Sequence, residues 1–284
     1  MTRPLRLEYE NAIYHVMNRG INRREIYSGD EHRNAFLGII SQASCIFGIE
    51  ILAWCLMKNH YHLLIKTPRG NLSRAMRHIN GVYTQYYNRK EMRDGPLFRG
   101  RYKAILVEGD DYLLQVSRYI HLNPVSAHIV ERPENYYWSS YRLYISSQPD
   151  FFLLKSDEIL SIISRNSHDR VKAYQKFVEE GLDEKTKQFY KSEITPVILG
   201  TEERKKFLLE GIEKNTAIFY EVSPDYNRTC VVPSLKVVVR ACAEFFDVDE
   251  KDILQPKRGK KNFTQKYCHV WWKGMGIRKA ECDC

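Results

Sequence analysis

Runs of β-branched, aromatic and other apolar residues alternate with segments of helical periodicity along the first 145 residues of this 284-residue chain. In a helix, apolar positions recur every three to four residues, whereas a short apolar run bounded by turn residues is typical of a strand. These patterns predict strands at 12–20, 49–57, 60–67 and 102–108, and helices at 30–48, 72–89 and 112–123. The order β-α-β-β-α-β-α indicates an α+β fold, with an antiparallel sheet and helices on one face.

Polar and special residues mark the predicted helix ends. The first helix should begin at a capping Asp30 and end at Gly48, which suits the left-handed conformation common after a helix. Asp110 and Asp111 form a second capping pair. Pro124 should end that later helix, because the residue before a proline disfavours the helical conformation.

The chain is expected to divide into three parts. Residues 1–145 should form one catalytic domain, in which the aromatic segment 136–144 packs against the sheet. Residues 146–195 read as a connector of short helices, and 196–284 as a mainly helical C-terminal region. The best amphipathic stretch of that region is 234–248.

Charge is unevenly distributed and points to a polyanionic partner. Residues 1–144 contain 20 Lys and Arg against 13 Asp and Glu (+7), and 145–256 contain 16 against 20 (−4). Residues 257–284 contain 8 against 2 (+6). Sixteen of the 20 basic residues in the first segment are Arg, whose planar group suits phosphate oxygens. The alternative is a basic surface that serves only solubility.

Cysteine usage and hydropathy bear on where the protein works. Seven scattered cysteines do not make a disulfide framework in a chain of this size, which favours a reducing compartment. No apolar run is long enough for a membrane span, and residues 1–10 lack the apolar core of a signal peptide. We therefore expect a cytoplasmic protein.

Two short motifs contain residues that could take part in catalysis. His60 and His62 flank Tyr61 on a predicted strand, so both imidazoles should project from one face, where a metal ion can bind between them. Tyr119 and Asn123 are four residues apart and share one helix face. A phenol can attack phosphorus, and an amide oxygen can complete a metal site. Taken singly, each pattern also fits a purely structural role.

Taken together, the motifs resemble the single-tyrosine HUH transposases, of the IS200-like group, and specifically their REP-associated bacterial branch. The matching segments occur in order and span nearly all of the first 145 residues: "HVMNRG", "KNHYHLLI", "GRYKAILVE", "RYIHLNPV" and "WSSYRLY". One departure is Lys58, where family members frequently have Pro. The resemblance implies a ferredoxin-like or RRM-like sheet, and a protein that is nucleoid-associated when bound to DNA.

The resemblance also implies a mechanism. His60, His62 and Asn123 would bind Mg²⁺ or Mn²⁺, and Tyr119 would cleave single-stranded or hairpin DNA through a 5′-phosphotyrosine, as a monomer or homodimer. The expected DNA-binding residues are the basic side chains nearest the motifs: Arg19, Arg74, Arg77, Arg99, Arg101 and Lys103. The candidate stacking faces for bases are Tyr83, Tyr86, Tyr87 and Phe98.

A second, shorter resemblance concerns the basic tail. Residues 238–262 are similar to the start of the helix-turn-helix domain of the bacterial chromosomal replication initiator, and the sequence after them departs from it. A truncated copy is one interpretation. His269, Cys282 and Cys284 could bind a soft metal, although an unstructured end fits them as well.

Two other functions compete with the transposase. A non-catalytic DNA-binding regulator descended from such an enzyme would keep the basic surface without turnover. A metal-dependent RNA nuclease on a related fold would use a metal but form no covalent tyrosine adduct. Adduct formation therefore separates these classes.

Overall fold

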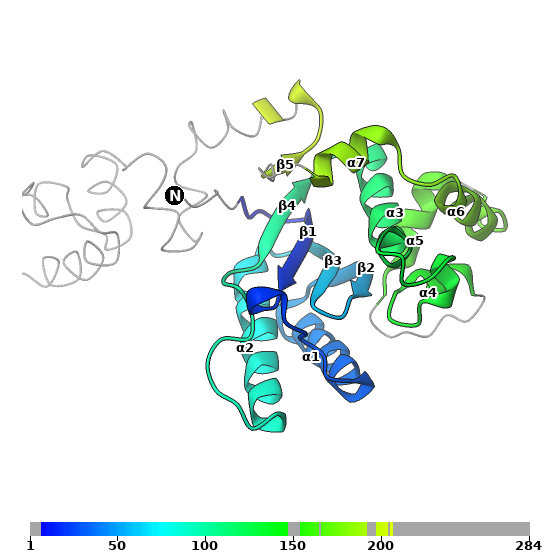
Figure 1. The fold of residues 1–284 in the computed structure, drawn as a ribbon. Helices are drawn as coiled ribbons and strands as arrows, with labels where there is room; N and C mark the ends of the chain where they lie inside the picture. The colour runs from blue at the N-terminus through cyan, green and yellow to red at the C-terminus, as the bar shows by residue number, and fades with distance from the viewer. Residues whose placement is uncertain (1–6, 147–153, 165, 192–196, 204, 207–284) are drawn as a thin grey trace, which may run out of the picture. The chain divides into compact units, whose positions relative to one another are not determined.

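The structure is a computed structural model that describes residues 7–146, 154–164, 166–191, 197–203 and 205–206 (Figure 1). Residues 8–207 form one compact unit, to which the following description applies. The basic segment 238–262, the amphipathic stretch 234–248, and His269, Cys282 and Cys284 lie outside the described residues. The proposed initiator-like domain is therefore left as a prediction.

One sheet of five strands, in the order β2-β3-β1-β4-β5, forms the centre of the fold (Figure 1). The strands are β1 Ala12–Arg19, β2 Glu50–Leu56, β3 His60–Thr67, β4 Lys103–Val107 and β5 Ile198–Leu199. The four strands predicted from the sequence are confirmed, and they pair antiparallel.

The fifth strand adds a parallel pair to the predicted antiparallel sheet. β5 is far along the chain and pairs parallel with β4. The Leu106 N–H donates to the Val197 carbonyl at 2.9 Å, and the Glu108 N–H donates to the Leu199 carbonyl at 2.8 Å. An edge strand leaves such groups unpaired, so a two-residue segment is enough to satisfy them. The sheet is mixed.

The helices confirm the α+β class. They are α1 Asp30–Phe47, α2 Leu72–Lys90, α3 Asp110–Ser126, α4 Tyr141–Ile145, α5 Ser156–Ile163, α6 Arg170–Glu179 and α7 Glu184–Lys191, with 3-10 turns at Ile21–Arg23 and Pro133–Asn135. No helix among the described residues is both long enough and apolar enough to cross a bilayer.

Helix ends follow the predictions at one of four places. Gly48 adopts a left-handed φ of 67° at the end of α1, as expected. The N-cap of α1 is Gly29 and Asp30 is already the first helical residue, so Asp30 does not cap the helix; its carboxylate instead accepts from the Trp138 indole at 3.1 Å and from Arg33 at 3.2 Å. Before α3 the N-cap is Gly109, so Asp110 and Asp111 lie in the first turn and do not cap the helix. Pro124 lies inside α3 rather than after it. In the last turn a proline removes only one helical bond, and the Ala127 N–H still donates to the Asn123 carbonyl at 3.0 Å.

Helices cover both faces of the sheet, which corrects the expectation of one covered face (Figure 1). On one face, the Phe36 ring of α1 lies 5.0 Å from that of Tyr61 and 4.8 Å from that of Tyr83. On the other face, Val116 and Ile120 of α3 share a buried cluster with residues of β2 and β3. Five consecutive residues of β3, 61–65, are buried, and a strand buried in both alternations needs cover on both sides.

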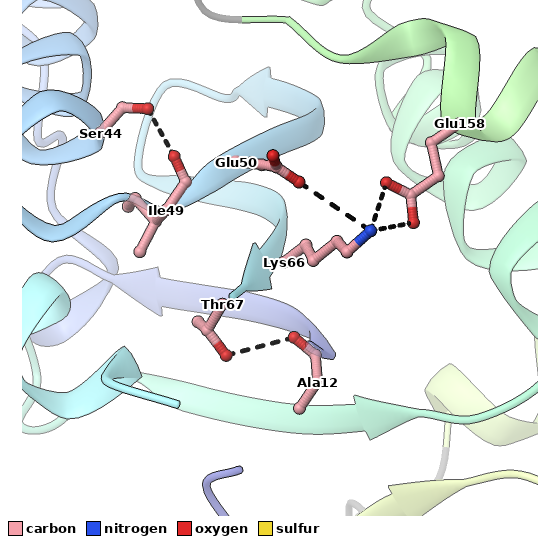
Figure 2. A network of polar contacts seen from close by, with 7 residues as sticks. All are labelled: Ala12, Ser44, Ile49, Glu50, Lys66, Thr67 and Glu158. Atoms are coloured by element: carbon pink, nitrogen blue, oxygen red, sulfur yellow. Dashed lines mark hydrogen bonds and ion pairs between the residues drawn. The ribbon is translucent and has the colours of Figure 1, made fainter. Parts of the chain in front are cut away.

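The short helices after Ile145 complete the second core. Ile159 and Leu160 of α5 and Tyr174 and Val178 of α6 are buried in the same cluster as α3. Figure 2 shows how α5 is also tied to the sheet: the Lys66 ammonium of β3 lies 2.9 Å from the Glu158 carboxylate of α5 and 3.9 Å from that of Glu50. The predicted domain boundary at Ile145 therefore separates segments that share one core, and it stays a prediction.

Candidate active site

His60 and His62 lie on the same face of β3, as the strand alternation predicts. Their ring centroids are 5.0 Å apart, and the ring planes are nearly perpendicular at 84°. Tyr61 points to the opposite face, where its hydroxyl donates to the Asn80 side chain at 2.8 Å. Burial lowers the pKa of His60 and lowers that of His62 further, so both imidazoles are neutral at pH 7. Neutral imidazoles have the lone pair that a metal ligand needs.

Helix α3 brings Tyr119 and Asn123 to this histidine pair. The Tyr119 ring lies 5.6 Å from the His62 ring in an edge-to-face arrangement. The Asn123 side chain is buried and lies close enough to the His60 imidazole and the Tyr119 hydroxyl to influence the pKa of each. The four residues that the sequence singled out from two distant segments therefore converge on one spot, between the sheet and α3.

The Tyr119 phenol is not an active nucleophile by itself. Burial raises its pKa to about 12, and the hydrogen bond with Asn123 offsets only part of that rise. At pH 7 the phenol is protonated, so its use as a nucleophile requires removal of the proton as the oxygen attacks.

Two further residues reach the site, and the sequence reasoning missed both. His15 of β1 is fully buried, and its Nε2 lies 2.9 Å from Nδ1 of His62. Its Nδ1 lies 2.7 Å from the hydroxyl of Tyr190 on α7. The Tyr190 ring also stacks on Tyr119, with centroids 3.5 Å apart and planes at 9°. The alternation of side chains along the "HVMNRG" strand could have indicated that His15 faces the site. Nothing in the sequence around Tyr190 indicates its contact with Tyr119.

The predicted DNA-binding residues do not all lie on the face of the histidine pair. Arg19 is the cross-strand partner of His60, and Lys103 pairs with Met17, the partner of His62. Both therefore share the face of the site. The Arg99 N–H donates to the Arg19 carbonyl at 2.9 Å, which places the loop before β4 beside the end of β1.

The remaining members of the predicted set lie elsewhere. Arg74 and Arg77 are exposed on α2, the helix that covers the opposite face of the sheet, and Arg101 is exposed just before β4. DNA contact by these six residues stays a prediction. The aromatic candidates are a clearer correction, because Tyr83, Tyr87 and Phe98 are at most 7% exposed and belong to the core. The Tyr83 and Tyr87 rings, at helical spacing in α2, are buried against α1 and the sheet, so they are not exposed for stacking on bases.

The donor set is compatible with one divalent cation. The His60 Nδ1 lies 2.7 Å from the Asn59 side-chain oxygen, and the His62 Nδ1 is engaged by His15. Each imidazole is therefore held through Nδ1 and leaves Nε2 for a ligand, the arrangement usual for metal-binding histidines. No cluster of three or more His, Cys, Asp and Glu side chains suited to a metal occurs in the described part of the chain.

Comparison with known proteins finds a family model that matches the part of the chain containing the site. Residues 8–123 match the family model described as "Transposase IS200 like", and this range includes all four residues of the proposed site. The resemblance to the IS200-like transposases is thereby confirmed over residues 8–123. This range begins before β1 and ends within α3, so the match extends over the four predicted strands and stops short of α5 to α7.

Individual proteins are also similar to this chain. A protein of Haemophilus influenzae named as a REP-associated tyrosine transposase is 25% identical over 130 residues, covering 42% of this chain and 73% of the relative. Among solved structures, a REP-associated tyrosine transposase bound to a REP hairpin is 16% identical, with a TM-score of 0.45, covering 55% of this chain and 98% of the other. A protein from Deinococcus radiodurans named as a transposase is 19% identical, with a TM-score of 0.31, covering 42% and 95%.

Proposed function

We propose that this protein is an IS200-like transposase, a metal-dependent endonuclease and strand transferase for single-stranded DNA, with Tyr119 as its nucleophile. The observation that supports the proposal is the convergence of Tyr119 and Asn123 with the His60 and His62 pair, from two segments of the chain that are nearly 60 residues apart. A phenol, two neutral imidazoles and an amide oxygen are the groups that metal-assisted attack on a phosphate requires.

The proposed metal would be Mg²⁺ or Mn²⁺, held by His60, His62 and Asn123. When bound, it would polarise the scissile phosphate and offset the charge that develops there. Helix α3 positions the nucleophile, because it holds the Tyr119 phenol beside the histidine pair. The Asn123 side chain lies on the same face of α3, beside the Tyr119 hydroxyl.

The reaction itself balances without a further co-reactant. The Tyr119 oxygen bonds to phosphorus, the bond from phosphorus to the 3′ oxygen breaks, the phenol loses its proton, and the leaving 3′ oxygen gains one. The 5′ end remains on the enzyme as a phosphotyrosine. Attack by the 3′-hydroxyl of another strand reverses the step, so the same site can join strands as well as cleave them.

We propose hairpin-forming or palindromic DNA as the substrate. The relative whose structure contains a REP hairpin suggests this class, and Arg19 and Lys103 lie on the face of the site, where they would contact phosphates. Electrostatic contacts of this kind position the strand without reading its sequence.

The decisive experiment is detection of the covalent adduct. Labelled hairpin oligonucleotides with a single-stranded flank are incubated with the protein and Mn²⁺ and separated on a denaturing gel. Wild type should give a labelled protein band, and Tyr119→Phe should give none. Tyr112→Phe, on the same helix, is the matched control and should behave like wild type. A metal-dependent cut without an adduct would favour an RNA or DNA nuclease of another mechanism, and binding without any cut would favour a regulator.

A further inference from the structure

A buried line of hydrogen-bonding groups extends from the proposed metal site into the protein. It consists of His62 on β3, His15 on β1 and Tyr190 on α7, joined at 2.9 Å and 2.7 Å. His15 is completely buried, and its two ring nitrogens are both engaged in this line. None of the reaction steps proposed above involves His15.

The two contacts restrict where the protons can be. A neutral imidazole has one N–H and one lone pair, so a line of two imidazoles can carry its protons in only two orders. In the first order, His62 donates from Nδ1 to Nε2 of His15, and His15 donates from Nδ1 to the Tyr190 oxygen. In the second order, Tyr190 donates to His15, His15 donates to His62, and Nε2 of His62 carries a proton.

Only the first order suits a metal ligand. A metal at Nε2 of His62 requires a lone pair there, and the second order removes it. We propose that His15 is a positioning residue that accepts the Nδ1 proton of His62 and thereby keeps the Nε2 lone pair of His62 facing the site. This inference rests on the proposed function, because it assumes that His62 binds a metal.

The position of His15 explains why an acceptor there has a large effect. Residues 61–65 around His62 are buried, so water does not replace a lost partner of its Nδ1. On the neighbouring strand β1, His15 lies opposite Leu64 and two residues from Met17, the partner of His62. The pairing of the two strands fixes the spacing between His15 and His62. Rotation or tautomer exchange of His62 would therefore be controlled by this one contact.

The test compares two replacements of His15 that differ in hydrogen bonding. His15→Leu fills much of the space and has no acceptor, whereas His15→Gln can place its side-chain oxygen near the former Nε2. Isothermal titration with Mn²⁺ should show affinity for His15→Leu lowered by about 10–100-fold, the usual effect of losing a partner of a metal-ligating histidine. His15→Gln should bind Mn²⁺ more tightly than His15→Leu.

A second measurement does not depend on metal or on activity. Long-range ¹H–¹⁵N spectra of histidine-labelled, metal-free protein report which ring nitrogen carries the proton. His62 should carry it on Nδ1 in wild type and in His15→Gln, and should shift toward Nε2 protonation in His15→Leu. Thermal denaturation shows whether each variant is folded at the temperature of measurement, so that the spectra compare folded proteins.

The possible results separate this inference from the proposed function. If wild type binds Mn²⁺ and forms the adduct but His15→Leu binds equally well, the positioning role of His15 is wrong and the function stands. A wild-type His62 protonated on Nε2 would also overturn the inference. If wild type neither binds Mn²⁺ nor forms an adduct, the proposed function fails and the premise of the inference fails with it.

Discussion

Tyr174→Phe tests whether the helices after Ile145 stabilise the helix that carries Tyr119. The Tyr174 hydroxyl on α6 is buried, lies 2.7 Å from Nδ1 of His121 on α3 and donates to the Ser117 hydroxyl at 3.0 Å. His121 is completely buried, so its Nδ1 would lose its partner with no access to water. The phenylalanine ring keeps the packing, which confines the change to hydrogen bonding.

The expected size follows from these contacts. Leaving one buried polar group unsatisfied costs about 1–3 kcal/mol. In a unit of this size, 1 kcal/mol lowers the melting temperature by roughly 2–4 °C, so a loss of about 2 kcal/mol corresponds to roughly 4–8 °C. The Ser117 hydroxyl adds little to this loss, because it still donates to the Leu114 carbonyl at 2.8 Å.

Tyr137→Phe provides the control, because Tyr137 is 65% exposed. Loss of this exposed hydroxyl should change the free energy of unfolding by less than about 0.5 kcal/mol. Urea denaturation and calorimetry of both variants measure the difference. Equal stability of Tyr174→Phe and Tyr137→Phe would refute the argument that α6 supports α3 through this network, and would favour the domain boundary at Ile145.

Three other predictions concern the site and its environment. His62→Ala should abolish adduct formation and Mn²⁺ binding in titration, and undiminished activity of wild type in excess chelator would contradict the metal proposal. Burial lowers the pKa of His15 and of His121 from 6.5 to about 3, so the stability that depends on their neutral forms is complete above pH 6.5 and is lost as pH falls toward 3. The melting temperature should therefore fall between pH 7 and pH 5, and a constant value would count against these shifts. Arg19→Ala should reduce the salt slope of DNA binding by about one unit, whereas Arg142→Ala on α4 should leave it unchanged.

A chain ending at Ile145 would keep all four proposed site residues but lose part of the core. Ile159, Leu160, Tyr174 and Val178 are buried in the same cluster as Val116 and Ile120. Removing the first four of these side chains would expose the face of α3 that they cover to water. Each fully buried side chain of this kind contributes about 1.5–3 kcal/mol relative to its exposed state. We expect the shortened chain to be much less stable than residues 1–207, as comparative denaturation would show.

Much of this protein was determined by local sequence. Four strands and three long helices follow from apolar periodicity and turn residues, because backbone geometry makes those patterns nearly unambiguous in long segments. The projection of His60 and His62 from one face also follows from strand geometry alone, as does the common helix face of Tyr119 and Asn123. Convergence of the two pairs came from family resemblance, since no local rule brings residues so far apart together.

Tertiary structure decided the rest. β5 joins the sheet because the edge of β4 has unpaired backbone groups, which a two-residue segment satisfies wherever it occurs in the chain. Pro124 stays within α3 because the packing of that helix outweighs the loss of one hydrogen bond. His15 and Tyr190 reach the site through contacts that link positions 47 and 175 residues apart. Such contacts depend on how strands and helices pack, and packing is a property of the whole unit rather than of any one segment.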